Sequence, residues 1–281
     1  MSEPYSAADG LVRVYPAREP NGTGLVWAHG GGFAGGDLDM PEADWVAREL
    51  AWRGTTVVSV DYRLVGDGCR YPAPSDDILS AWAWAQDSAA RLRVDRGRLA
   101  IGGASAGANL VTGATLRLIE AGAATVPALV LLAYPTLLAV QPAPDAALRA
   151  ALDATPAFDR FGPDVVRAMY ENFLGGPVDV APLPAVPGLA TAGDLAEFPP
   201  TLIVNGDVDE LRVSGELFAR TLRAAGRDVE AVVETGTDHG HLNRPHAGPA
   251  ASVTIDRFAS RLAALRTPDL ASVTLDEGTA S

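Results

Sequence analysis

A serine flanked by small residues is the first position in this sequence that could act as a nucleophile. Residues 103–107 read Gly-Ala-Ser-Ala-Gly, with Ser105 at the centre. The apolar residues 99–102 predict a strand before it, and the Ala- and Leu-rich residues 105–121 predict a helix after it. A Gly-x-Ser-x-Gly sequence at such a junction is typical of a nucleophile elbow, which exposes the serine hydroxyl above a sheet. A plain glycine-rich turn with Ser105 as the helix cap would have the same residues.

Three consecutive glycines follow the apolar run at 25–28. His29 precedes Gly30, Gly31 and Gly32, and Phe33 comes next. Successive glycines expose their N–H groups and let a ligand oxygen approach closely, which suits an oxyanion hole. His29 would then brace the loop and not act as a base. A flexible glycine turn is the alternative.

Acidic and histidine side chains follow two later apolar runs, at 201–204 and 229–233. The acidic group comprises Asp207, Asp209 and Glu210, and the histidines are His239 and His241. Together with Ser105 they run in the chain order Ser…Asp…His, which can form a triad for acyl transfer. The residue types alone leave open which carboxylate and which histidine take part.

Strand-like and helix-like segments alternate along the chain and must position these side chains. Strands are expected at 11–15, 25–28, 55–60, 99–101, 128–133, 201–204 and 229–233, and helices at 41–53, 75–90, 105–121, 211–225 and 249–265. This alternation predicts an α/β fold with a mostly parallel, doubly wound sheet covered by helices on both faces.

Residues 135–200 break the alternation, since they hold 11 of the 21 prolines and one amphipathic candidate helix at 163–173. We interpret residues 136–196 as an insertion that forms a reduced cap, where open α/β sheets bind ligands. Residues 1–266 are then a single domain, and the polar residues 267–281 are expected to be disordered.

Charge and composition exclude several classes of function. The net charge is −13, and all 22 of the Lys and Arg residues are Arg. Absence of lysine excludes a P-loop, a Schiff-base lysine and a Ser-Lys dyad, and the acidic balance argues against nucleic-acid and membrane partners. Cys69 is the one cysteine, so an internal disulfide is excluded. The first residues lack the basic and apolar regions of a signal peptide, and the apolar stretch 126–140 is too short to span a bilayer. We therefore expect a cytoplasmic protein.

The motifs as a set resemble the hormone-sensitive-lipase-like branch of the α/β-hydrolases over roughly residues 11–265. They are His-Gly-Gly-Gly-Phe at 29–33, Asp-Tyr-Arg-Leu at 61–64, Tyr-Pro-Ala at 71–73, Gly-Ala-Ser-Ala-Gly at 103–107, Asp-Glu-Leu-Arg at 209–212 and His-Gly-His-Leu at 239–242. The resemblance implies an α/β-hydrolase fold and a carboxylesterase for short acyl chains that needs no metal or organic cofactor.

The same resemblance assigns roles to the motif residues. It implies Ser105 as nucleophile, His239 as base and Asp209 as triad acid, with Asp207 second. It places the oxyanion at the N–H groups of Gly31, Gly32 and Ala106. His29, Gly30, Phe33 and His241 would line the substrate site.

This chain departs from that family in two places. Only 28 residues precede His29, so we expect this chain to lack the N-terminal cap helices of that family, and Ala104 stands where the family usually has Asp or Thr. The insertion could wall an acyl pocket with Phe158, Phe161, Met169, Tyr170 and Phe173, although packing onto the body would explain most of them.

The sequence thus predicts a serine carboxylesterase for small-molecule esters. An amidase, lactonase or acyltransferase with the same triad, or a non-catalytic ligand-binding protein of the same fold, are the alternatives, and a homo-oligomer is left open.

Overall fold

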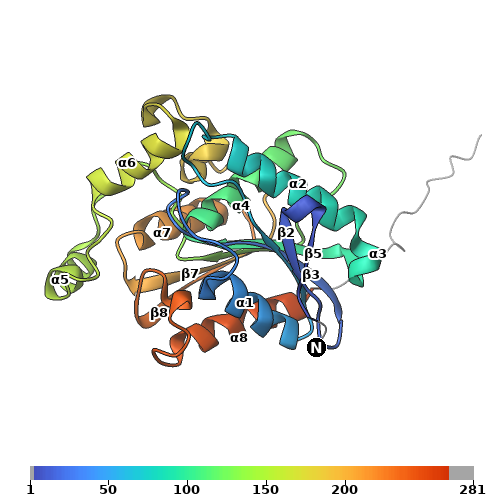
Figure 1. Ribbon diagram of the computed structural model, residues 1–281. Helices are drawn as coiled ribbons and strands as arrows, with labels where there is room; N and C mark the ends of the chain where they lie inside the picture. The colour runs from blue at the N-terminus through green and yellow to red at the C-terminus, as the bar shows by residue number, and fades with distance from the viewer. Residues whose placement is uncertain (1–2, 266–281) are drawn as a thin grey trace, which may run out of the picture.

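An eight-stranded twisted sheet runs through the computed structural model, which describes residues 3–265 (Figure 1). Its order is β1-β2-β4-β3-β5-β6-β7-β8; β2 is antiparallel to both neighbours, and the six strands from β4 to β8 are parallel. The predicted mostly parallel sheet is confirmed. The strands are β1 (Tyr5–Ala7), β2 (Val12–Tyr15), β3 (Gly22–Ala28), β4 (Thr56–Val60), β5 (Val94–Ala104), β6 (Val130–Ala133), β7 (Thr201–Val208) and β8 (Val229–Asp238).

Helices connect the strands and cover the sheet. They are α1 (Pro41–Trp52), α2 (Ala73–Asp87), α3 (Ala89–Leu92), α4 (Ala106–Glu120), α5 (Ala146–Ala154), α6 (Pro163–Leu174), α7 (Arg212–Ala224) and α8 (Ala250–Ala263), with short 3-10 turns at Ala8–Gly10, Val178–Val180, Leu183–Ala185, Pro187–Leu189 and His241–Asn243. Proline at the first position starts α1 and α6, where a missing N–H costs nothing, and Gly175 in the left-handed region ends α6.

The sheet separates two hydrophobic cores. Alternate residues of β3 point to opposite faces, so Val26 packs in one core and Trp27 in the other. The core on the Val26 side takes residues from α2, α4 and α7, whereas the core on the Trp27 side takes residues from α1 and α8. Figure 1 shows α1 and α8 together below the sheet. Burial on both faces explains why the parallel strands are continuous apolar runs.

Residues 136–196 lie between β6 and β7, and they contain two helices where the sequence predicted one. The predicted helix is α6, which buries Val166, Tyr170 and Phe173 along one face. The additional helix is α5, which Asp145 caps by accepting a hydrogen bond from Leu148 N–H at 2.8 Å. Leu148 packs with Val213 of α7. The proline count of the segment obscured this short helix.

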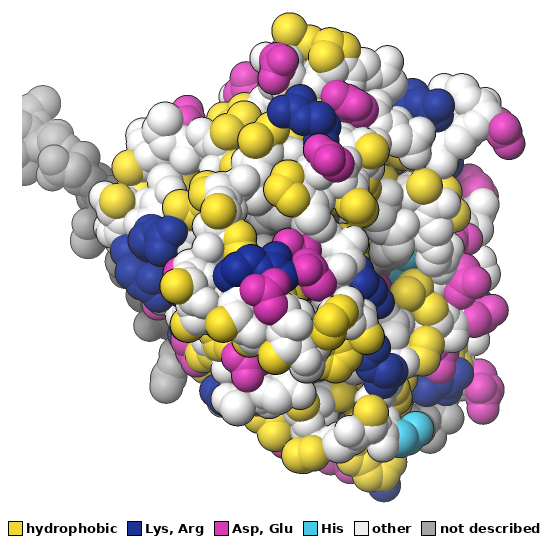
Figure 2. Space-filling view, turned by 90° about the vertical axis from the view of Figure 1, so that its left-hand side faces the viewer, with side chains coloured by type: hydrophobic (Ala, Val, Ile, Leu, Met, Phe, Trp, Pro, Cys, Tyr) yellow, Lys and Arg dark blue, Asp and Glu magenta, His cyan; other side chains and the backbone are white. Residues whose placement is uncertain are grey.

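Charged side chains of both signs are interspersed on the face in Figure 2, with hydrophobic side chains scattered between them. Within residues 3–265, no helix is long and apolar enough to cross a membrane. The disordered tail predicted at 267–281 lies outside the described residues.

Two backbone segments approach each other closely where α4 begins. A Cβ added to Gly107 would lie 2.3 Å from the carbonyl oxygens of both Ala28 and His29. A Cβ added to Gly103 would lie 2.6 Å from the carbonyl carbon of Gly107. Glycine at 103 and 107 therefore allows the start of α4 to pack directly against the ends of β3 and β5.

We expect Gly107→Ala to lower the free energy of unfolding by about 1–3 kcal/mol, because the neighbouring backbone would have to move. Urea denaturation measures this. Gly176→Ala is the matched control, since a Cβ there would meet nothing within 4 Å. Equal stability of the two variants would contradict the close approach.

Candidate active site

Ser105 lies at the tight turn between β5 and α4. Its φ of +52° and ψ of −115° fall outside the regions that side-chain-bearing residues favour. The turn is held because Ser105 N–H donates to Ala133 O at 2.9 Å. This is the strained strand–turn–helix geometry expected from residues 103–107.

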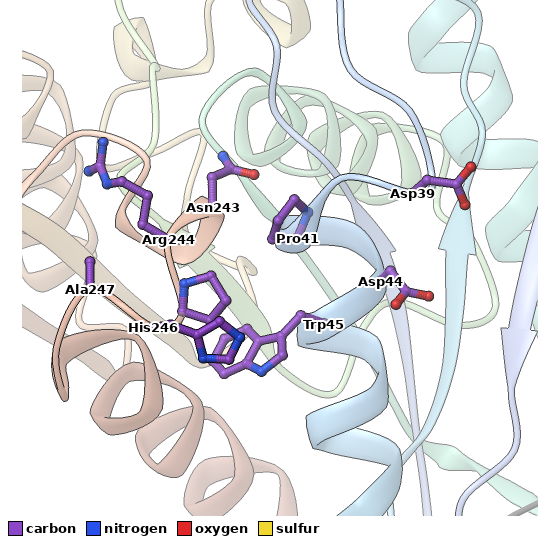
Figure 3. Close-up of a pocket in the computed structure, with 9 residues that line it drawn as sticks. Asp39, Pro41, Asp44, Trp45, Asn243, Arg244, His246 and Ala247 are labelled. Carbon is purple, nitrogen blue, oxygen red and sulfur yellow. The ribbon is translucent and has the colours of Figure 1, made fainter.

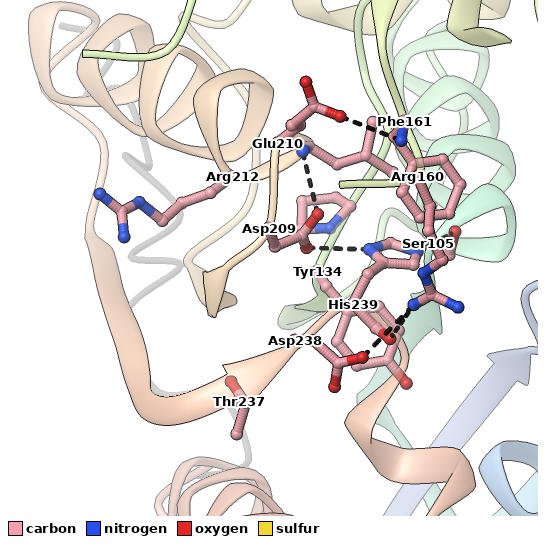
Figure 4. A network of polar contacts seen from close by, with 12 residues as sticks. Ser105, Tyr134, Arg160, Phe161, Asp209, Glu210, Arg212, Thr237, Asp238 and His239 are labelled. Carbon is pink, nitrogen blue, oxygen red and sulfur yellow. Dashed lines mark hydrogen bonds and ion pairs between the residues drawn. The ribbon is translucent and has the colours of Figure 1, made fainter. Parts of the chain in front are cut away.

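Three side chains from the ends of three strands form a continuous hydrogen-bonded row (Figure 4). Ser105 Oγ lies 2.9 Å from His239 Nε2, and His239 Nδ1 lies 2.8 Å from Asp209 Oδ2. Because the Asp209 carboxylate accepts, the proton of a neutral His239 sits on Nδ1. Nε2 is then free to accept the serine proton. Asp209 is fully buried, and Leu211 N–H donates to its Oδ1 at 3.0 Å.

The other two carboxylates of the acidic group face elsewhere. Asp207, at the end of β7, accepts through Oδ2 from Gly236 N–H of β8 at 2.9 Å. Glu210 Oε2 accepts from Phe161 N–H at 3.0 Å. The structure thus brings Asp209, and neither neighbour, into contact with His239.

The glycine loop passes directly beside the serine. A Cβ added to Gly30 would lie 3.1 Å from Ser105 Cβ. Gly31 and Gly32 both have positive φ, and among residues 3–265 their N–H groups have no acceptor. Ala106 N–H belongs to the first residue of α4, where helix N–H groups are unpaired and favour negative charge. These donors can bind an oxyanion.

The residues on either side of the glycines brace the loop. His29 is buried, stacks on Tyr62 with 4.5 Å between ring centroids, and donates from Nδ1 to Gly30 O at 2.7 Å. Phe33 stacks on Phe173 of α6 with ring centroids 4.0 Å apart. Phe33 thus anchors the loop to the insertion.

His241 is buried behind His239. Its Nε2 lies 2.9 Å from Thr254 Oγ1 on α8, and its ring meets Tyr134 edge-on. Burial lowers the pKa of His241 to about 4, and the neighbouring His239 adds to the effect. His241 is therefore neutral near pH 7.

Segments of the insertion cover the row of three side chains. Phe161 meets the His239 ring edge-on with centroids 4.5 Å apart, and Arg160 Nη2 donates to His239 O at 3.0 Å. Burial raises the pKa of Glu210, and its hydrogen bond with Asp159 adds to this. Of the aromatic residues suggested as pocket walls, Phe161 reaches His239, whereas Tyr170 and Phe173 are buried in the core.

Sequence reasoning missed one buried acid beside the glycine loop. Glu42, on α1, is 2% exposed and accepts from Gly30 N–H and from Tyr134 O–H, both at 2.6 Å. Tyr134 follows β6, and its ring meets His239 edge-on. No motif marks Glu42, which reads as an ordinary first-turn acid of a surface helix.

A separate cavity of about 570 Å³ lies between α1 and the loop after β8 (Figure 3). Its lining includes Trp45, Arg244 and His246, and it does not include the Ser105–His239–Asp209 row.

Comparisons with known proteins place the chain in a family. The sequence pattern of the family described as alpha/beta hydrolase fold matches residues 25–243. Carboxylesterase NlhH of Mycobacterium tuberculosis is 37% identical over 265 residues, which cover 90% of this chain and 79% of the relative. Ethyl acetate hydrolase of Pseudomonas putida is 30% identical over 246 residues, which cover 82% of this chain and 71% of the relative.

Solved structures match as well. Esterase LipW from Mycobacterium marinum superposes with a TM-score of 0.77 and 31% identity, covering 93% of this chain and 80% of the other. Carboxyl esterase 2 from the fungus Tuber melanosporum has a TM-score of 0.80 and 26% identity, covering 95% and 88%. The resemblance found in the sequence is confirmed: the chain belongs to the α/β-hydrolase family of carboxylic ester hydrolases.

Proposed function

We propose that this protein is a serine esterase that hydrolyses short-chain esters through Ser105, His239 and Asp209. The observation that carries the proposal is the row Ser105 Oγ–His239 Nε2 and His239 Nδ1–Asp209 Oδ2, with both distances under 3 Å. The row lies beside a loop whose N–H groups can bind an oxyanion. A non-catalytic ligand-binding protein would not need this row.

In the proposed mechanism, Ser105 Oγ attacks the ester carbonyl while His239 Nε2 takes the serine proton. Asp209 holds the imidazole in the correct tautomer and stabilises the imidazolium. The N–H groups of Gly31, Gly32 and Ala106 stabilise the oxyanion. His239 then protonates the leaving alcohol, and a water molecule repeats the sequence on the acyl-enzyme.

The preference for short acyl chains is supported by insertion side chains that lie close to the catalytic row. Phe161 meets the His239 ring, and a Cβ at Gly32 would lie 3.4 Å from Met169 Sδ. The relative named ethyl acetate hydrolase acts on a short ester, as its name states. We extend the proposal to a single hydrolase domain whose residues 136–196 act as a reduced cap. The cytoplasmic location remains a prediction of the sequence.

Ser105→Ala should abolish release of nitrophenol from p-nitrophenyl acetate and the initial burst, while the protein stays folded. His239→Ala should lose a similar amount, because members of a triad act as a unit. His241→Ala should lose much less, since its Nε2 bonds Thr254 and not Ser105. A larger loss for His241→Ala would contradict the choice of base.

Asp209→Asn should lower turnover by about 10⁴-fold, because the amide favours the wrong imidazole tautomer. Asp207→Asn, two residues earlier at the end of β7, is the matched control and should cost far less, since Asp207 accepts a hydrogen bond from Gly236. Steady-state kinetics on one activated ester compares the two. Equal losses would rule out Asp209 as the triad acid.

The specificity constant kcat/KM for p-nitrophenyl esters should peak between acetate and butyrate and fall by octanoate. Each buried CH₂ contributes about 0.8 kcal/mol, and a longer chain gains this only in a deep apolar channel. We expect no rise in rate when the substrate forms an emulsion. A specificity constant that rises through decanoate would show that the insertion encloses such a channel.

A further inference from the structure

The proposed oxyanion donors depend on the orientation of two peptide units around Gly30. The unit between His29 and Gly30 is held at both ends: Tyr62 O–H donates to His29 O at 2.9 Å, and Gly30 N–H donates to Glu42 Oε1 at 2.6 Å. The next unit carries Gly31 N–H. Its carbonyl, Gly30 O, accepts from His29 Nδ1 at 2.7 Å, and the Tyr62 hydroxyl oxygen lies 3.2 Å from it. Side chains therefore set the direction of Gly31 N–H, although glycine itself imposes none.

Glu42 is the charged member of this arrangement. Its side chain is almost fully buried, and among residues 3–265 the partners of its two carboxylate oxygens are neutral groups. Its two oxygens instead receive two short hydrogen bonds, from Gly30 N–H and Tyr134 O–H. Bonds to a carboxylate are roughly twice as strong as neutral ones.

Tyr134 connects Glu42 to the base, because its hydroxyl bonds Glu42 and its ring packs against His239. Burial raises the pKa of Tyr134 well above its usual value, and the charge of Glu42 adds to this, so the phenol stays a donor. The Tyr134 ring meets His239 edge-on with centroids 5.0 Å apart. Glu42 thus connects the glycine loop to the group that packs against the base.

We propose that Glu42 is a positioning residue that aligns the N–H groups of Gly31 and Gly32 for the oxyanion. This inference rests on the function proposed above. Glu42 touches no reacting atom; it acts by fixing the backbone of Gly30, from which the donors extend. Loss of Glu42 would leave Gly30 N–H and Tyr134 O–H buried without an acceptor and release the loop.

The test compares 4-nitrophenyl acetate with its thionoester, O-(4-nitrophenyl) thionoacetate. Both release the same nitrophenol, but the thionoester develops charge on sulfur, which accepts hydrogen bonds poorly and gains less from the donors. The kcat/KM for the ester divided by the kcat/KM for the thionoester therefore reports how well the donors are aligned. This ratio is independent of the fraction of enzyme that is folded, because both values are measured on the same sample. Glu42→Ala should lower this ratio by about 10-fold or more, since one lost oxyanion donor costs about 10²–10³-fold in turnover.

Glu42→Gln keeps one carbonyl oxygen for one of the two donors, and it should lower the ratio by about threefold. If Glu42→Ala does not fold, the Glu42→Gln variant alone tests whether Glu42 aligns the donors. Asp44→Asn is the matched control: Asp44 also lies on α1 and accepts from a tyrosine, Tyr15, at 2.8 Å, but it is not bonded to the glycine loop. Its ratio should stay at the wild-type value.

The outcomes separate the two proposals. If Ser105→Ala is inactive but Glu42→Gln and any folded Glu42→Ala keep the ratio within twofold of wild type, the role of Glu42 is wrong and the proposed function stands. If Ser105→Ala hydrolyses the ester at the wild-type rate, the proposed function is wrong and the role of Glu42 falls with it. A fall of more than twofold that Asp44→Asn does not share supports the proposal.

Discussion

The strained backbone at Ser105 is the constraint on which the rest of the site depends. A residue with φ of +52° and ψ of −115° persists only where its surroundings determine its conformation. Here the peptide groups of Ser105 are held on both sides, since its N–H donates to Ala133 O and its carbonyl accepts from Asn109 N–H at 3.2 Å. The turn also needs glycine at 103 and 107, because the backbone of α4 meets the ends of two strands there.

Two buried carboxylates flank the site, and their partners give them different roles. Asp209 accepts from the His239 ring and from one backbone N–H, so its charge acts on the imidazole. Glu42 accepts from a backbone N–H and a phenol, so its charge acts on the loop. A buried carboxylate is costly unless hydrogen bonds compensate it, and in both cases two short bonds do so. The parallel sheet makes this arrangement possible because β5, β6, β7 and β8 all end at the same edge.

The insertion contacts residues at the carboxyl ends of the parallel strands, where the site lies. Phe173 stacks on Phe33 of the glycine loop, Arg160 donates to the His239 carbonyl, and Glu210 accepts from Phe161 N–H. Each contact joins the insertion to a residue next to, or within, a proposed catalytic element. The insertion therefore helps to order the site through these three contacts.

Periodicity and glycine placement were enough to predict seven of the eight strands, the main helices on the sheet, the turn at Ser105 and the glycine loop, because these features depend on local residue types; strand β1 (Tyr5–Ala7) was not predicted. The order of Ser, Asp and His was also visible, but Asp207 and Asp209 could be ranked only by resemblance. The two side chains point in different directions: Asp207 contacts Gly236 of β8, whereas Asp209 contacts His239. Helix α5 was missed because the many prolines around it obscured a short helix, which packs through Leu148 on Val213, over 60 residues away in sequence. Glu42 was missed because it meets Tyr134, 92 residues along the chain, and only the folded sheet brings the end of β6 to the start of α1. Long-range packing, which no local pattern encodes, decided which polar groups meet in the site.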